Sequence, residues 1–182
     1  AYDDPQIIAG QGTVGLEIAE QTAALGLQVD QALFCCSGGG LVAGSALALC
    51  AAHAATRVYS VEPAGFDDHA RSLAARAAPP VANAPGGRSI CDALQAPTPG
   101  AVTYPINRAL LAGGLVVTDD EVRAAMRYAF TWLKLVLEPG GAVALAAVLA
   151  GKLPTADRVT AVVLSGGNAD PDQFAQILAA AG

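Results

Sequence analysis

The sequence predicts an α/β protein of three layers, in which a mostly parallel sheet carries helices on both faces. Short apolar segments of strand length alternate along the chain with longer segments of helical periodicity. A glycine-rich turn, Ser37–Gly40, joins one such strand directly to a helix. No repeat or low-complexity linker interrupts the 182 residues, so we expect one domain with a sizeable core.

The first half of the chain contains a regular alternation of elements. Thr13 is a suitable N-cap for a first helix, and Gly26 is suited to the position just after its end. Asp67 has the same capping role in the helix predicted after residue 66. The predicted ranges are helices over 13–25, 41–52 and 67–77 and strands over 32–36 and 57–61.

The second half begins with turn-forming segments and ends with longer elements. Proline, glycine and alanine make 79–87 a loop and 97–100 a turn, and the segment 89–94 is ambiguous. Thr118 or Asp119 is the expected N-cap of a strongly amphipathic helix. The predicted ranges are strands over 115–117 and 159–164 and helices over 120–135, 140–149 and 171–180.

Composition and charge exclude several classes of partner. The chain is 53% hydrophobic and only 14% charged, which predicts that much of its surface is covered by further chain or by a partner. A formal charge of −6 argues against nucleic acid and against an anionic membrane surface. No apolar run reaches membrane-spanning length, and the acidic N-terminus is unlike a signal peptide.

The four cysteines show no metal-ligand spacing. Cys35 and Cys36 are adjacent in a predicted buried strand, whereas Cys50 and Cys91 are isolated. This arrangement indicates reduced thiols, and we therefore expect a cytoplasmic protein.

The turn Ser37–Gly40 is the strongest sign of a binding site. Three adjacent glycines allow positive φ angles and let an anion approach the backbone without obstruction by a Cβ atom. Successive amide groups there form an anion-binding nest, and the helix beginning near Leu41 adds the positive end of its dipole. The turn is therefore suited to a phosphate group.

Two interpretations of that phosphate remain open at this point. Gly38, Gly40 and Ala43 also fit the dinucleotide fingerprint, and Glu62 ends the next strand about where a ribose-binding acid is expected. A Rossmann-type nucleotide-binding module is thus one alternative. A glycine-rich loop without any ligand is the other.

Ser165 follows the last apolar strand and precedes two glycines and Asn168. It is either part of a turn before a helix or a hydroxyl presented at the carboxyl edge of the sheet, where a flat ring could lie.

Taken together, seven motifs in this order resemble the threonine/serine ammonia-lyases (dehydratases) and serine racemases. These enzymes use pyridoxal phosphate on fold type II, the tryptophan-synthase-β-like fold. The motifs are Tyr2–Pro5 with Ile8–Thr13, Ser37–Leu41, Val61–Pro63 with Asp67-Asp68, Pro97–Gly100, Lys134–Val136 with Glu138-Pro139, Gly141–Ala144, and Leu164–Asn168.

The resemblance implies a cofactor site and a reaction. It implies that Ser37, Gly38, Gly39, Gly40 and Leu41 surround the phosphate of pyridoxal 5'-phosphate and that Ser165 faces the pyridine nitrogen. A serine hydroxyl donates to a neutral ring nitrogen, which favours β-elimination of water from L-threonine or L-serine over transamination. The products are a 2-oxoacid and ammonia; racemisation of serine and elimination from hydroxyaspartate are alternatives within the family.

One departure from the family pattern is large. The family attaches its cofactor to a lysine in an N-terminal Ser-x-Lys-x-Arg segment, but the two lysines here, Lys134 and Lys152, lack that context. We therefore expect residues 1–182 to be the C-terminal part of the large, cofactor-binding domain. The segment with the lysine and the small domain are then absent, and this chain alone is expected to be inactive. A folded remnant without chemistry remains a third alternative.

Smaller departures concern the wall beside the substrate. Ala93 stands where many relatives have glycine, and Gly140 where many have serine. Both weaken any assignment of the amino-acid substrate. The resemblance further implies a small-molecule amino-acid substrate and a homodimer in the complete enzyme.

A divalent cation is a further expectation from the resemblance. The ligands of metal-binding relatives correspond here to Glu62, the backbone carbonyl of Phe66, and Asp68, and such oxygen donors suit Mg²⁺ or Ca²⁺. The alternative is that Asp67 and Asp68 only stabilise the start of the next helix. His69 is expected to be exposed to solvent.

Overall fold

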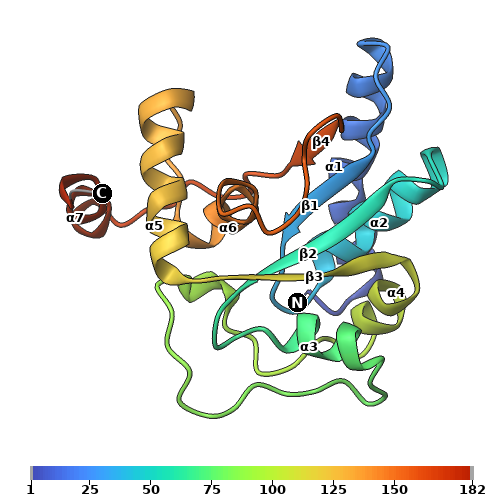
Figure 1. The fold of residues 1–182 in the computed structure, drawn as a ribbon. Coiled ribbons are helices and arrows are strands. Elements are labelled where there is room, and N and C mark those ends of the chain that lie inside the picture. Colours follow the sequence, from blue (N-terminus) through green and yellow to red (C-terminus); the bar gives the residue numbers. More distant parts are fainter. Residues whose placement is uncertain (1, 181–182) are drawn as a thin grey trace.

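The computed structural model describes residues 2–180 and shows a parallel sheet between two layers of helices (Figure 1). Within these residues the four strands lie in the order β3-β2-β1-β4, and all three pairings are parallel. The strands are β1 (Gln31–Cys35), β2 (Arg57–Pro63), β3 (Leu111–Val117) and β4 (Thr160–Val162). The predicted fold class is confirmed.

Helices cover both faces of the sheet. On one face, α2 (Gly40–Ala52) and α3 (Asp68–Ala75) pack against the strands, and α1 (Pro5–Ala24) and α4 (Thr103–Leu110) pack against α2. On the other, α6 (Pro139–Leu149) lies against the sheet, with α5 (Asp119–Tyr128) and α7 (Pro171–Ala179) outside it. Figure 1 shows α5, α6 and α7 as a group on the side opposite α1 and α2.

Two apolar clusters form the core, one on each face. Because side chains alternate along a strand, Leu33 and Val61 join the cluster with α5 and α6, whereas Phe34 and Val58 join the cluster with α2. Burial on both faces explains why β1 is apolar without interruption apart from Gln31.

The first helix starts earlier than the sequence predicts. Asp4, not Thr13, is its N-cap: the Asp4 carboxylate accepts the amide of Gln6 at 2.8 Å, and Pro5 occupies the first turn. Thr13 lies inside the helix and donates its hydroxyl to the carbonyl of Gly10. The prediction was wrong because Gly12 and other small residues, which let α1 approach α2 closely, weaken the helical signal.

Two further expectations on this side of the sheet were wrong. The helix expected over 67–77 is shorter, and Asp67 makes no capping hydrogen bond; its carboxylate pairs with Arg71 at 3.1 Å instead. Helix α4 was missed altogether. Its first turn is capped from far away in sequence, because the Asp3 carboxylate accepts the amides of Ala101, Val102 and Thr103.

The second half agrees more closely with the prediction. Thr118 is the N-cap of α5 and forms a capping box with Glu121. The α-helix ends at Tyr128, and a π-helical turn, Ala129–Leu133, continues it to Lys134, whose φ of 60° ends the helix. Strand β3 is longer than the predicted 115–117, and β4 is shorter than the predicted 159–164.

The two threonines provide a matched test of these caps. Thr118→Ala should lower the free energy of unfolding by about 1 kcal/mol, because the amide of Glu121 loses its acceptor. Thr13→Ala should leave stability unchanged or raise it by a few tenths of a kcal/mol, because alanine is the better residue inside a helix. Urea unfolding followed by circular dichroism measures both, and equal losses in the two variants would contradict the assignment.

Candidate active site

The glycine turn lies at the carboxyl end of β1, as the sequence predicts. Gly39 is the N-cap of α2 and has a φ of 93°, which explains why a glycine is needed there. A Cβ atom on Gly39 would also lie 2.6 Å from Nδ2 of Asn107 and 2.7 Å from Cε1 of His69. Neither the backbone conformation nor the space accepts a side chain at this position.

The carbonyl groups of the turn are directed away from the cavity and into the protein. The Gly38 carbonyl accepts the hydroxyl of Thr103 at 2.5 Å and the amide of Gly100 at 3.2 Å. The Gly39 carbonyl accepts the side-chain amide of Asn107 at 3.2 Å. Helix α4 therefore holds the turn in place, and the first amides of α2 have no partners within the helix. This leaves amide donors available to an anion.

A cavity of about 380 Å³ lies against this turn. Ser37 contributes to its wall, and its Oγ accepts the amide of Ala96 at 3.0 Å, so the hydroxyl proton remains available for donation. The lining residues include no lysine or arginine, so an anion here would be held by neutral donors and the dipole of α2. The cavity is lined by Tyr2, Cys35, Cys36, Ser37–Leu41 and Asp92–Ala96.

Ser165 lies beside this cavity. Its Oγ is 2.9 Å from Sγ of Cys35, one of the lining residues. Burial raises the pKa of the Cys35 thiol, so the thiol stays protonated and can donate to Ser165. The hydroxyl proton of Ser165 is then free for another acceptor. The structure thus brings the predicted phosphate turn and Ser165 to the same end of β1.

The start of α6 completes this edge of the sheet. The amide of Glu138 donates to the carbonyl of Gly166 at 3.1 Å, which joins two of the motifs noted in the sequence. A Cβ atom on Gly140 would lie 3.6 Å from Cβ of Ala93, which lines the cavity. The two small departures from the family pattern are therefore neighbours at one wall of the site.

Neither lysine belongs to the cavity. Lys134 is exposed at the end of the π-helical turn and donates to the carbonyl of Thr131 at 2.7 Å. Lys152 pairs with Glu121 at 2.8 Å, at the start of α5. Both amines are thus engaged elsewhere.

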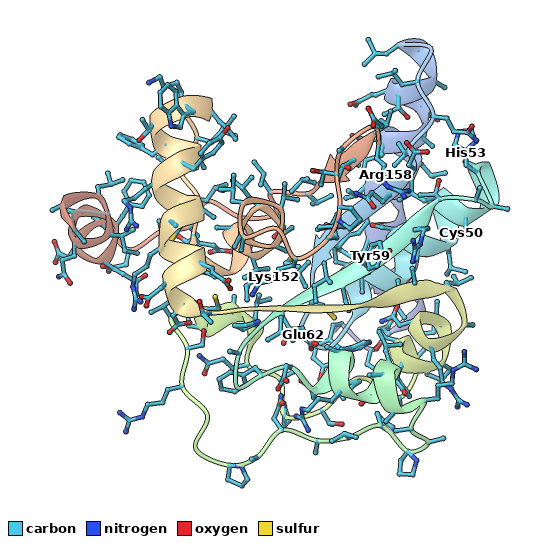
Figure 2. All side chains as sticks on the ribbon, viewed as in Figure 1. Cys50, His53, Tyr59, Glu62, Lys152 and Arg158 are labelled. Carbon is cyan, nitrogen blue, oxygen red and sulfur yellow. The ribbon has the colours of Figure 1, made fainter. Side chains whose placement is uncertain are left out.

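Glu62 is buried completely and binds the start of α3 (Figure 2). Its two carboxylate oxygens accept the amides of His69 at 3.1 Å and Ala70 at 2.7 Å, so Glu62 takes the capping role expected of Asp67. Burial raises the pKa of Glu62 well above its usual value. A residue held in this way is not available to a ribose, which argues against the nucleotide-binding alternative.

Asp68 is the second buried carboxyl group of this region. Its Oδ1 accepts the side-chain amide of Asn83 at 2.5 Å, whereas its Oδ2 is buried without a partner. Burial raises the pKa of Asp68 to about 6, and the Asp68 charge in turn helps to raise the pKa of Glu62. Phe66, the third expected metal ligand, lies half-buried in the turn between them.

The expectation that His69 is exposed was wrong. Its side chain is fully buried beneath the glycine turn, where Nε2 accepts the amide of Asn107 at 2.9 Å. Burial lowers the pKa of His69 to about 4, so the ring is neutral near pH 7. The sequence pattern placed it next to two aspartates on a short helix and contained no sign of the overlying turn.

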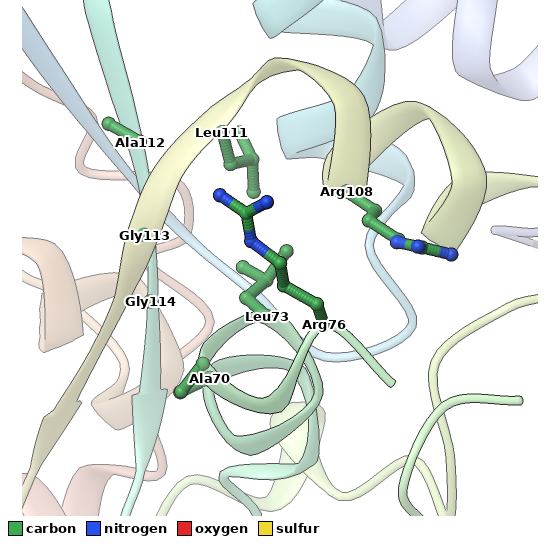
Figure 3. A pocket seen from close by; sticks show the side chains of 9 residues that line it. Ala70, Leu73, Arg76, Arg108, Leu111, Ala112, Gly113 and Gly114 are labelled. Carbon is green, nitrogen blue, oxygen red and sulfur yellow. The ribbon is translucent and has the colours of Figure 1, made fainter. Parts of the chain in front are cut away.

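A second cavity, of about 430 Å³, lies away from this site between α3, α4 and the N-terminal half of β3 (Figure 3). Arg76 and Arg108 are its only charged lining residues, and both are exposed. It contains no titratable group near neutrality, and none of the motifs found in the sequence lies there.

Sequence reasoning missed the residues that support the site. Thr103 and Asn107 lie 65 and 68 residues from the glycines that they bind, on a helix that the sequence did not predict. Asp3 stabilises the start of that helix and so supports the turn indirectly. The only available signal was the acidic pair before Pro5, which is equally typical of a turn.

A phosphate-type nest at the carboxyl end of a parallel strand defines a protein that binds a phosphorylated small molecule. The family model for pyridoxal-phosphate dependent enzymes matches residues 1–166. The chain belongs to this family, and the resemblance seen in the sequence is confirmed.

The relatives include two kinds of enzyme. The chain is 36% identical over 178 residues to the catabolic L-threonine dehydratase of Escherichia coli K12, covering 97% of this chain and 52% of that protein. It is 36% identical over 174 residues to the serine racemase of Arabidopsis thaliana, covering 93% of this chain and 50% of that protein.

Solved structures agree with this result. A bacterial threonine deaminase, from T.th., superposes with a TM-score of 0.86 at 40% identity, covering 92% of this chain and 54% of that one. Maize serine racemase gives 0.82 at 36% identity, with coverages of 93% and 52%. The chain thus spans about half the length of the relatives it matches. Among residues 2–180, no helix has the length and apolar character needed to cross a membrane.

The raised pKa of Asp68 predicts a pH dependence of stability. The folded state holds this proton more tightly than the unfolded chain, so its stabilising effect is present at low pH and is lost as pH rises from about 4 to about 6. With a chelator present, Asp68→Asn should remove a loss on the order of 2 kcal/mol over this window.

Urea unfolding at several pH values measures this effect. Asp67→Asn, at the neighbouring and more exposed carboxyl group, serves as the control and should keep the pH dependence of the original chain. Parallel curves for Asp68→Asn and the original chain would contradict the prediction.

Proposed function

We propose that the complete protein is a pyridoxal-phosphate dependent ammonia-lyase that eliminates water from L-threonine or L-serine to give a 2-oxoacid and ammonia. The observation that supports this proposal most directly is the position of Ser165 beside the glycine turn, joined to the cavity wall through Cys35. The 36% identity to a threonine dehydratase and 40% identity to a threonine deaminase point the same way.

The residues of the turn fit the cofactor's phosphate. The amides of Gly38, Gly39, Gly40 and Leu41 and the hydroxyl of Ser37 supply donors, and α2 adds the positive end of its dipole. Side chains at the glycines would fill the space: a Cβ atom on Gly40 would lie 2.7 Å from the backbone oxygen of Tyr2.

Ser165 is assigned to the ring nitrogen of the cofactor. When bound, pyridoxal phosphate withdraws electrons from the reacting carbon of the amino acid. The Ser165 hydroxyl accepts from the Cys35 thiol and donates its own proton to the ring nitrogen. A hydroxyl leaves that nitrogen neutral where a carboxylate would keep it protonated, and the weaker withdrawal favours loss of a β-hydroxyl group.

The amine that holds the cofactor belongs, in this proposal, to protein outside this chain. Lys134 and Lys152 are engaged at α5 and do not line the cavity. Residues 1–182 then form the C-terminal portion of the large domain. The N-terminal segment with the Schiff-base lysine and the small domain would enclose the site and exclude water. The chain alone would be inactive.

The most exposed apolar side chains support a covered surface. Trp132 is 71% exposed at the end of the π-helical turn, and Val136 is 49% exposed shortly after it. We propose that further chain or the second subunit of a homodimer covers this segment. The cysteines of the described residues are free thiols, which is in keeping with the cytoplasm.

A divalent cation is the second part of the proposal. Glu62, the carbonyl of Phe66, and Asp68 would bind Mg²⁺ or Ca²⁺ through oxygen donors. Support comes from the unpartnered, buried Oδ2 of Asp68 and from the mutual repulsion of the two carboxyl groups. A cation would relieve both.

The reaction is tested with two preparations, the chain alone and the chain completed by its N-terminal segment. The chain alone should yield no 2-oxoacid and no borohydride-reducible pyridoxyl group on Lys134 or Lys152, as measured by peptide mass mapping. The completed protein should form the 2-oxoacid. There, Ser165→Ala should lower turnover at least about tenfold while cofactor absorption persists.

Ser37→Ala provides the matched control for Ser165. It should weaken cofactor affinity with a smaller effect on turnover of the loaded enzyme, because Ser37 faces the phosphate. Full activity of Ser165→Ala would reject its role, and a stoichiometric adduct with turnover in the chain alone would reject the fragment. Release of D-serine rather than a 2-oxoacid would favour a racemase.

The cation is tested by thermal unfolding. Mg²⁺ or Ca²⁺ at about ten times its Kd should raise the melting temperature by about 3 to 6 °C, and Glu62→Gln should abolish the increment. Asp67→Asn should retain it. A melting curve unchanged across millimolar concentrations of either ion would reject the site.

A further inference from the structure

Three side chains with metal-binding atoms converge beneath the glycine turn. Cys36 follows β1, Glu62 lies at the end of β2, and His69 lies at the start of α3. A thiol sulfur, a carboxylate oxygen and a ring nitrogen of these residues all lie within 4.8 Å of one another. The three residues are 2%, 0% and 0% exposed, so this is an interior cluster and not a group of surface acids.

The surroundings of the cluster contain polar atoms without partners. Buried polar groups in native proteins nearly always have a hydrogen-bond partner, and an exception calls for a ligand, an ion or water. The four unpartnered buried side-chain atoms found in residues 2–180 belong to this part of the α3 face or to the residues contacting it. They are Ser60 Oγ, Asp68 Oδ2, His69 Nδ1 and Asn107 Oδ1.

We propose that Cys36, Glu62 and His69 bind a zinc ion beneath the glycine turn. Thiolate, imidazole and carboxylate are the three protein ligand types of Zn²⁺, and a sulfur donor disfavours Mg²⁺ and Ca²⁺. Bond lengths of about 2.0 to 2.3 Å place tetrahedral ligand atoms about 3.3 to 3.8 Å apart. The observed cluster reaches this geometry through a contraction of roughly 1 Å.

Charge balance favours a doubly charged ion at this position. Burial raises the pKa of the Cys36 thiol and of the Glu62 carboxyl group, so both hold protons when no ion is bound. Zinc binding releases the thiol proton and the carboxyl proton to solvent. The thiolate and the carboxylate then cancel the double positive charge of the ion, and the buried site is neutral.

Asn107 supplies the second contact that a metal-bound histidine needs. In the structure Nε2 of His69 accepts from the Asn107 amide, so the ring proton is on Nδ1, which has no partner. When Nδ1 binds the ion, the proton moves to Nε2 and requires an acceptor. Rotation of the Asn107 amide presents its unpartnered Oδ1 to Nε2, at the expense of the longer 3.2 Å contact with Gly39.

The site would stabilise the turn above it. A Cβ atom on Gly39 would lie 2.7 Å from Cε1 of His69, so the imidazole is in direct contact with the turn. An ion fixing Cys36 and His69 would therefore fix both the start and the support of the anion-binding amides. The site shares Glu62 with the oxygen-ligand site proposed above but differs in its donors and its ion, and it does not depend on the enzymatic activity.

The test measures zinc content and coordination in the reduced, purified protein. After loading with Zn²⁺ and removal of excess ion, elemental mass spectrometry should find about one zinc per chain. Cys36→Ser and His69→Gln should each weaken affinity at least about tenfold in a chelator competition. Cys50→Ser and His53→Gln are matched controls and should keep the ion; Figure 2 shows both residues far along α2 from Glu62.

Cobalt spectroscopy keeps the test decisive if the Cys36 and His69 variants do not fold. The original chain loaded with Co²⁺ should show a thiolate-to-metal charge-transfer band, which Cys50→Ser should retain. Asp68→Asn should also keep zinc while losing the response to Mg²⁺. Absence of stoichiometric zinc, absence of the thiolate band, or zinc retained by a folded Cys36→Ser protein would overturn the proposal.

Discussion

The site depends on how the backbone of Ser37–Gly40 is held. Its carbonyl groups bind Thr103, Asn107 and Gly100, so its amide groups are left facing the cavity. The constraint has two parts: a positive φ at Gly39, and contact with the imidazole of His69 directly beneath. Helix α4 is therefore as much a part of the anion site as the glycines are, although it contributes no atom to the cavity.

A second constraint comes from the acidic groups buried on the same face. Glu62 stabilises the start of α3 through two amide hydrogen bonds, yet its burial and the nearby Asp68 oppose its ionisation. Such an arrangement is stable when protons or a cation are present and is strained otherwise. Cys36 and His69 extend the cluster toward the glycine turn, so ion binding and the shape of the anion site are coupled through the same few side chains.

The opposite side of the molecule has a different physical character. There α6 is buried almost entirely, and its small residues let it approach the sheet and the segment around Gly166. Beyond the end of α5 the chain exposes large apolar side chains, above all Trp132. The chain spans about half the length of its relatives, and a surface of this kind is suited to contact with further protein.

The sequence by itself determined the fold class, the anion-binding turn and the family. Alternating periodicity and three adjacent glycines are local signals, and they persist in the folded chain. It did not determine that Asp4 and not Thr13 begins α1, that Asp3 caps α4, or that His69 is buried. These depend on contacts between residues as far apart as Asp3 and Thr103, and on burial that shifts the pKa of Asp68 and His69. Only the tertiary structure decides them, because hydrogen bonding and desolvation arise from neighbours that are distant in sequence.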